Sequence, residues 1–214
     1  HPNRHKTMGN YIAVKSRIFE NQDSKGVVVL NGDDAILSRL QPDTKARVLY
    51  FSRKKILSRG AWVENNRIVM DIGNGPEKIC PVGDIFIPGA HNLENALAGV
   101  LAAGIMGAEP AVIAGVLKTF PGVEHRIERV ETVRGVTFFN DSKGTNPDSS
   151  VKAIEAMPGS TVLIAGGMDK KSSFSGLVDA FGDKIKALVL LGETAEIIAQ
   201  TAREKGFQNI YQVN

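Results

Sequence analysis

The sequence holds a single cysteine, Cys80, among its 214 residues. One thiol can form neither an internal disulfide nor a cysteine-based metal cage, and a chain without disulfides fits a reducing compartment. No apolar run reaches the roughly 20 residues that a membrane-spanning helix needs. These absences exclude a disulfide-stabilised scaffold and predict a cytoplasmic protein without a membrane partner.

A strong charge of one sign is also missing. The chain carries 26 basic and 23 acidic residues, a formal net charge of +3. It has no basic block interleaved with aromatic residues, so a nucleic-acid partner is not expected. The one short basic run, Arg53-Lys54-Lys55, is interpreted as a solvated turn. The GxxxxGK(S/T) phosphate-loop pattern occurs nowhere in the chain.

The hydrophobic content of 43% and the charged content of 23% are those of an ordinary globular protein. The break at Thr119-Phe120-Pro121-Gly122 predicts a boundary between domains at 1–120 and 121–214. In the first, buried strands at 26–31 and 46–52 precede an antiparallel ribbon within 61–87 and helices at 92–101 and 110–118. The second alternates helices and strands, which predicts a parallel α/β layer.

The stretch 120–150 gathers the most chemistry. Strand formers on both sides of the turn signal Arg134-Gly135 predict a hairpin, which returns Asp141–Thr145 to the neighbourhood of Glu124-His125-Arg126. Asn146 and Pro147 then suit the N-cap and first position of a helix. The grouping of Arg, His, Lys, Asp and Thr at a helix N-terminus suits a nucleotide phosphate or an acidic substrate; the alternative is a capped polar loop.

Lys15 falls on the apolar stripe of a first helix that Thr7 can cap and that is expected to run to about Phe19. One interpretation is snorkelling, with the stem buried and the amine in water. The other is a neutral amine that adds carbon dioxide, giving a carbamate that supports Mg²⁺.

Further candidates follow strands or begin helices. Asn31-Gly32-Asp33-Asp34 forms a polar loop at the end of a buried strand, where ligand sites of α/β sheets lie. Asn92 is expected to be an N-cap, whereas Asn95 is a mediocre helix former with no such explanation. Lys170 follows Gly166-Gly167 and is either an anion contact or a solvated lysine.

Several motifs together resemble the Mur ligases, ATP-dependent amide-forming enzymes of peptidoglycan synthesis. The last of them, NDSKGTNP, indicates the D-glutamate-adding branch of the family. The matching segments cover the whole chain and are His1–His5, Tyr11–Phe19, Asn31–Asp34, Gly89–Ala96, Glu124–Arg126 and Asn140–Pro147.

The resemblance implies ATP and Mg²⁺ as cofactors. His1 would ligate Mg²⁺, and Lys15, as a carbamate, would be a catalytic residue that supports a second metal ion. Asn95, Arg126 and Asp141 would hold the adenine, phosphate and ribose of the nucleotide.

The resemblance also implies the substrates UDP-MurNAc-L-Ala and D-glutamate. Lys143, as a catalytic residue, together with Thr145 and Lys170 would face the acceptor amino acid and the transferring group. The fold would be the later part of a central ATPase domain, mostly a parallel sheet with a small antiparallel ribbon, followed by a Rossmann-like C-terminal domain. The parent protein would be a monomer.

The pattern of the family is incomplete in this sequence. The UDP-binding domain and the phosphate-loop half of the central domain are expected to be missing, as is the end of the C-terminal domain. The chain would then be a fragment without ligase activity of its own. Two alternatives stay open: a ligase similar to folylpolyglutamate synthase, and a non-catalytic nucleotide-binding module.

Overall fold

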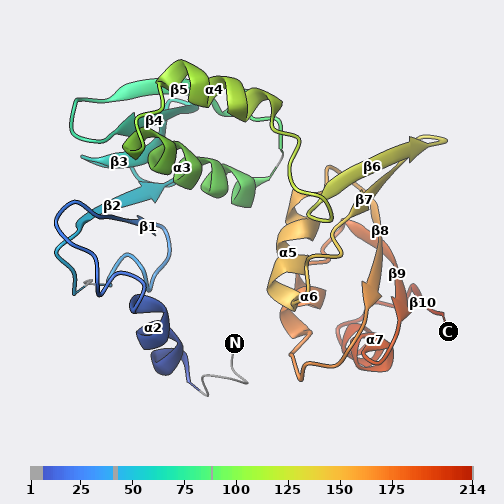
Figure 1. Cartoon of the computed structure of the whole chain (residues 1–214). Coiled ribbons are helices and arrows are strands. Elements are labelled where there is room, and N and C mark those ends of the chain that lie inside the picture. The colour runs from blue at the N-terminus through green and yellow to red at the C-terminus, as the bar shows by residue number, and fades with distance from the viewer. Residues whose placement is uncertain (1–6, 41–42, 88, 214) are drawn as a thin grey trace. The chain divides into compact units, whose positions relative to one another are not determined.

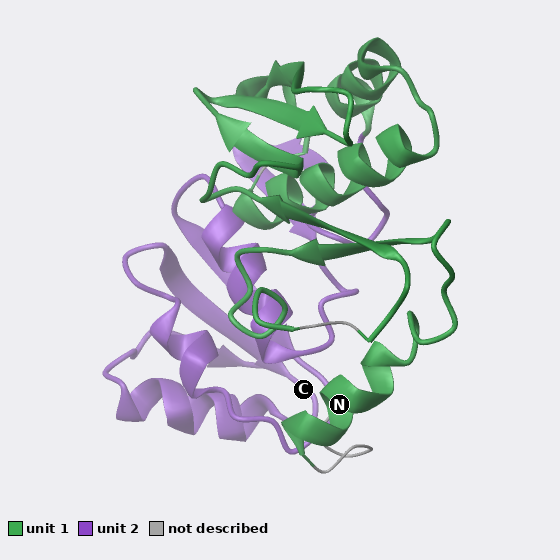
Figure 2. Ribbon diagram, turned by 90° about the vertical axis from the view of Figure 1, so that its left-hand side faces the viewer, with its two compact units in different colours: residues 1–120 green, residues 121–214 purple. Residues whose placement is uncertain are grey.

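The computed structural model describes residues 7–40, 43–87 and 89–213. The chain divides into two compact units, the first ending at Phe120 and the second beginning at Pro121 (Figure 2). The elements of the first unit are α2 (Met8–Ser16), β1 (Val27–Asn31), β2 (Arg47–Ser52), β3 (Gly60–Glu64), β4 (Arg67–Asp71), β5 (Glu77–Pro81), the short 3₁₀ helix η1 (Val82–Asp84), α3 (Ala90–Ile105) and α4 (Pro110–Thr119).

A five-stranded mixed sheet in the order β1-β2-β3-β4-β5 organises the first unit (Figure 1). Strands β1, β2 and β3 are parallel, and β3, β4 and β5 pair antiparallel. The β3–β4 turn is made by Asn65 and Asn66, both with positive φ, the left-handed geometry that suits tight hairpins. The predicted combination of parallel strands with an antiparallel ribbon is therefore confirmed, although the pairings are divided equally between the two kinds.

Both faces of this sheet are covered, as parallel strands require. Val27 and Val29 of β1 pack on the core that α3 and α4 complete. Val28 and Leu30 point to the other face and pack with Phe19. The side chains of β1 thus pack in two cores, one on each face of the sheet, which is why its sequence is continuously apolar rather than alternating between apolar and polar residues.

The second unit contains a hairpin and a three-stranded parallel sheet in the order β10-β9-β8 (Figure 1). The hairpin turn is Arg134-Gly135, with both φ values positive, as its sequence predicts. Helices α5, α6 and α7 share one buried core with β9. The elements are β6 (Glu128–Val133), β7 (Val136–Asn140), α5 (Pro147–Ala156), β8 (Thr161–Gly166), α6 (Ser175–Asp179), β9 (Ile185–Leu191), α7 (Ala195–Glu204) and β10 (Ile210–Gln212).

Two local predictions are corrected. The first helix ends at Ser16 rather than near Phe19, because i→i+3 bonds replace the helical ones from Ile18 onward. Helix α3 begins at Ala90 with Gly89 as its N-cap, so Asn92 lies inside the first turn and is not the cap. Among the described residues, no helix is both long and apolar enough to cross a bilayer.

Candidate functional site

The two polar runs of the second unit lie side by side. The backbone N–H of Lys143 donates to the carbonyl oxygen of His125 at 3.0 Å, and the backbone N–H of Ile127 donates to Asp141 Oδ1, also at 3.0 Å. Asn140 Nδ2 lies 2.9 Å from His125 Nδ1. The hairpin thus brings Arg126 and the loop 140–146 together, as expected.

Arg126 occupies an unusual stretch of backbone. Its neighbours His125 and Ile127 have φ values of 65° and 48°, in the left-handed region that a β-branched residue rarely adopts. Such a residue costs about 1–3 kcal/mol and persists only where its surroundings impose it. The bond from Ile127 N–H to the Asp141 carboxylate is one contact that imposes it here.

Helix α5 begins directly after this loop. Asn146 Oδ1 accepts the backbone N–H of Ser149 at 2.9 Å, and Pro147 occupies the first helical position, which confirms the predicted cap. Thr145 therefore lies just ahead of a helix N-terminus, whose partial positive charge favours an anion.

Lys170 reaches the same loop from the end of β8. Its Nζ donates to the carbonyl oxygen of Thr145 at 3.3 Å, over a separation of 25 residues. Lys143, Thr145 and Lys170 are all exposed. Together with Arg126 they place three cations around the start of α5, with the half-buried carboxylate of Asp141 beside them. This arrangement can bind a phosphate or a carboxylate.

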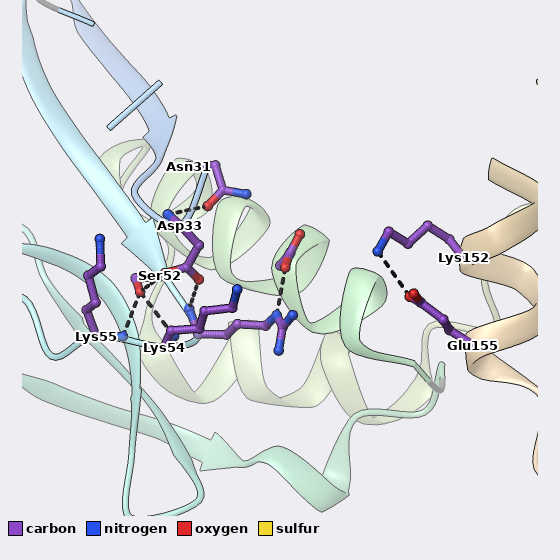
Figure 3. Close-up of polar contacts among 9 residues, drawn as sticks. Asn31, Asp33, Ser52, Lys54, Lys55, Lys152 and Glu155 are labelled. Atoms are coloured by element: carbon purple, nitrogen blue, oxygen red, sulfur yellow. Dashed lines mark hydrogen bonds and ion pairs between the residues drawn. The ribbon is translucent and has the colours of Figure 1, made fainter. Parts of the chain in front are cut away.

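In the first unit, the carboxyl ends of β1 and β2 are tied by Asp33 (Figure 3). Its carboxylate accepts the Ser52 hydroxyl at 2.5 Å and the Arg53 backbone N–H at 2.8 Å. The Asn31 side chain in turn accepts the Asp33 N–H at 2.9 Å. Asp33 thus holds the two loops together through both of its carboxylate oxygens.

The basic run 53–55 is not the solvated turn that its composition predicts. Arg53 Nε donates to Glu94 Oε1 at 2.7 Å, and Lys55 Nζ donates to the carbonyl oxygen of Gly32 at 3.1 Å. Of the three, Lys54 and Lys55 are exposed, but Arg53 is half-buried. Sequence reasoning missed Ser52, Arg53 and Glu94, and only the placement of Asp33 at a strand end pointed to this region.

Lys15 lies on the stripe where the sequence places it. The stripe lines a cavity of about 520 Å³ between α2 and β1. The lysine itself is exposed, with its Nζ 5.7 Å from the centre of the Tyr11 ring, a cation–π distance. The exposed amine is compatible with both interpretations of Lys15, and its role stays a prediction.

Asn95 is exposed on α3, and its Nδ2 lies 3.4 Å from Asn92 Oδ1. His1, the other predicted metal ligand, lies outside the described residues. Within the described ranges, no three His, Cys, Asp or Glu side chains group together as a metal site would require.

Comparison with known proteins agrees with these features. The Mur ligase middle domain matches residues 1–103, and the Mur ligase glutamate ligase domain matches residues 125–214. A UDP-N-acetylmuramoylalanine–D-glutamate ligase from Thermoanaerobacter sp. is 50% identical over 207 residues, covering 97% of this chain and 46% of the relative. The chain thus spans about half the length of the curated relatives that it matches.

Solved structures show the same fold. MurF from Acinetobacter baumannii superposes with a TM-score of 0.75 at 16% identity, covering 99% of this chain and 48% of that one. MurF from Thermotoga maritima, solved in complex with ADP, gives a TM-score of 0.66 at 15% identity over 98% of this chain and 49% of that one. With one family domain matched in each of its two units, the chain belongs to the Mur ligase family.

Proposed function

We propose that the parent protein is an ATP-dependent ligase that joins D-glutamate to UDP-MurNAc-L-Ala in cytoplasmic peptidoglycan synthesis, acting as a monomer. The observation that carries the proposal is the 50% identity over 207 residues to a D-glutamate ligase. The same identity disfavours a folylpolyglutamate-synthase-like activity. The two units are proposed to be the later part of the central ATPase domain and most of the C-terminal ligase domain.

The proposed chemistry is phosphorylation of the UDP-MurNAc-L-Ala carboxylate by ATP, followed by attack of the D-glutamate amine and loss of phosphate. Such a reaction needs positioning and neutralisation of charge rather than a covalent enzyme intermediate. The cations Arg126, Lys143 and Lys170 around the start of α5 suit these anions. Asp141 would accept a ribose hydroxyl, and Thr145 would help to hold D-glutamate.

Magnesium is proposed as the partner of ATP, with His1 as a ligand of one ion and a carbamate on Lys15 as the support of a second. The described residues do not by themselves form a metal cluster of His, Cys, Asp or Glu side chains. The exposed position of Lys15 leaves its amine accessible to carbon dioxide.

The test measures D-glutamate-dependent phosphate release from ATP in the parent protein and in its Lys15→Ala variant, with and without a short carboxylic acid. Loss of activity that the acid restores supports the carbamate. Lys45→Ala, at an exposed lysine of the same unit, is the control and should retain full activity. Unchanged activity in Lys15→Ala would mean that the lysine only snorkels.

Two results would contradict the proposed D-glutamate ligase activity and indicate a different function. Turnover with a folate acceptor and none with D-glutamate would identify the other ligase class. ATP binding with no turnover of either acceptor would identify a nucleotide-binding module. The 214-residue chain, which spans about half of its relatives, is expected to give no turnover when assayed beside the parent.

The acceptor contacts have a separate test. Lys143→Ala, Thr145→Ala and Lys170→Ala should each raise KM for D-glutamate or lower kcat, because each removes a group at the start of α5. Lys186→Ala, at an exposed lysine of β9, should change neither constant. Wild-type kinetics in all three site variants would remove this loop from the proposed site.

A further inference from the structure

One chain of contacts in the first unit has no part in the chemistry described so far. It begins at Asp33, whose Oδ2 accepts the backbone N–H of Arg53 at 2.8 Å. It continues through the Arg53 side chain, whose Nε donates to Glu94 Oε1 at 2.7 Å. The contacts join residues 20 and 41 positions apart. They therefore connect the ends of β1 and β2 to helix α3.

Arg53 is held at both its backbone and its side chain, which makes it a stiff connection. The side chains of Arg53 and Glu94 are 32% and 29% exposed, so each has lost most of its contact with water. A short charged hydrogen bond in such a place fixes direction as well as distance. The position of Glu94 is thus set by the sheet.

The N-terminal part of α3 is held by the packing of its buried residues Asn92, Ala96 and Leu97, and the ion pair adds a directional contact to that packing. The N-cap of α3 is Gly89, which offers no side-chain cap. Asn95 follows Glu94 directly, and its bond to Asn92 is long at 3.4 Å. A rotation of this first part of the helix would move the Asn95 carboxamide with it. The ion pair with Arg53 opposes such a rotation.

We infer that Arg53 and Glu94 are positioning residues that aim the Asn95 carboxamide at the adenine ring of ATP. The inference rests on the proposed function, in which Asn95 contacts that base. Hydrogen bonding to a base edge depends steeply on direction. Loosening the pair should therefore weaken recognition of the base and leave the acceptor amino acid unaffected.

The experiment uses the parent protein with Arg53→Gln, Glu94→Gln and the exchanged pair Arg53→Glu/Glu94→Arg. KM for ATP should rise up to about fivefold in each single variant, the effect of a partly exposed ion pair. The preference for ATP over GTP in kcat/KM should fall, and KM for D-glutamate should stay constant. The exchanged pair should recover part of the loss. Lys118→Gln, which breaks the 3.0 Å pair with Asp84 in the same unit, is the matched control.

A purely structural role would lower the melting temperature and change the constants for both substrates alike, and that result would overturn the inference. So would an unchanged KM for ATP in both single variants. Titration calorimetry of ATP alone gives the same answer without turnover. If the unmodified parent shows no D-glutamate-dependent turnover, the proposed function fails, while weaker ATP binding in Arg53→Gln would still support the positioning role.

Discussion

The C-terminus of helix α5 is held by one lysine. Lys184 Nζ donates to the carbonyl oxygens of Glu155 at 2.7 Å, Met157 at 3.2 Å and Ile154 at 3.3 Å. All three protons of the ammonium group therefore find an acceptor. Of these carbonyls, that of Ile154 also accepts the backbone N–H of Met157 at 3.2 Å. All three lie at the end of the helix, where its dipole adds a partial negative charge. We predict that Lys184→Met destabilises the second unit.

The size of the effect follows from the contacts. A hydrogen bond to a charged group contributes about 1.5–3 kcal/mol, and the helix dipole adds about 0.3–1 kcal/mol. Only the 2.7 Å bond to Glu155 is short, and the carbonyls can be hydrated in the variant, so the two longer bonds add little. Methionine keeps the apolar stem. The expected loss is about 2 kcal/mol, which corresponds to a fall of about 8–16 °C in the melting temperature of a unit of this size, Pro121–Asn214.

The assay is thermal unfolding followed by far-ultraviolet circular dichroism, which reports the helices. Trp62, the only tryptophan, lies buried in the first unit, and its fluorescence gives a separate record of that unit. Lys186→Met is the matched control because this lysine is exposed on β9. A circular-dichroism transition that is the same in Lys184→Met and in the control would refute the reasoning.

Three further predictions concern single contacts. Asn146→Ala removes the cap of α5 and should cost about 1 kcal/mol, measured by denaturant unfolding, with no change expected from Asn146→Asp. Burial, followed by the charge of Asp84, raises the pKa of the Cys80 thiol above its ordinary value of 9.0. The stability that the buried neutral thiol contributes is present below pH 9.0 and is lost as pH rises through the pKa of the folded state. Cys80→Ala should therefore reduce the fall in the free energy of unfolding at alkaline pH. The hydrogen bond from Gln212 is the main cause that lowers the pKa of Glu196, and this contribution is lost as pH falls through the folded pKa. Gln212→Ala should raise that pKa in an NMR titration, and no change would contradict the assignment.

Local signals in the sequence predicted most of the fold. The cap at Asn146, the turn at Arg134-Gly135 and the helical spacing of α3 depend on residues a few positions apart, and the structure confirms them. The predicted end of the first helix was wrong because the apolar spacing continues through the turns after Ser16. A period shows which face is apolar, but it does not show where helical hydrogen bonding stops.

The contacts around Asp33 could not be predicted in this way. Its partners Ser52 and Arg53 are 19 and 20 positions away, and the Arg53–Glu94 bond spans 41 positions. Only the pairing of β1 with β2 and the packing of α3 bring them together. From composition alone, the three neighbouring cations at 53–55 are all expected to be solvated. In the folded chain, the side chain of Arg53 instead forms an ion pair with Glu94.

The acidic residues after β1 and the lysines near the start of α5 also differ in how far their side chains are already held by the fold. The carboxylates of Asp33 and Asp34 follow a buried strand, where catalytic acids are often found, yet each already accepts two hydrogen bonds from its own unit. Lys143 is exposed beside a helix N-terminus, and the exposed Lys170 makes one 3.3 Å hydrogen bond to the carbonyl oxygen of Thr145. A carboxylate that accepts two short hydrogen bonds must lose them before it can bind a ligand, whereas these lysines lose water and one long bond. On this argument a ligand should bind at the start of α5, and the strand ends of the first unit should act by holding α3 in place.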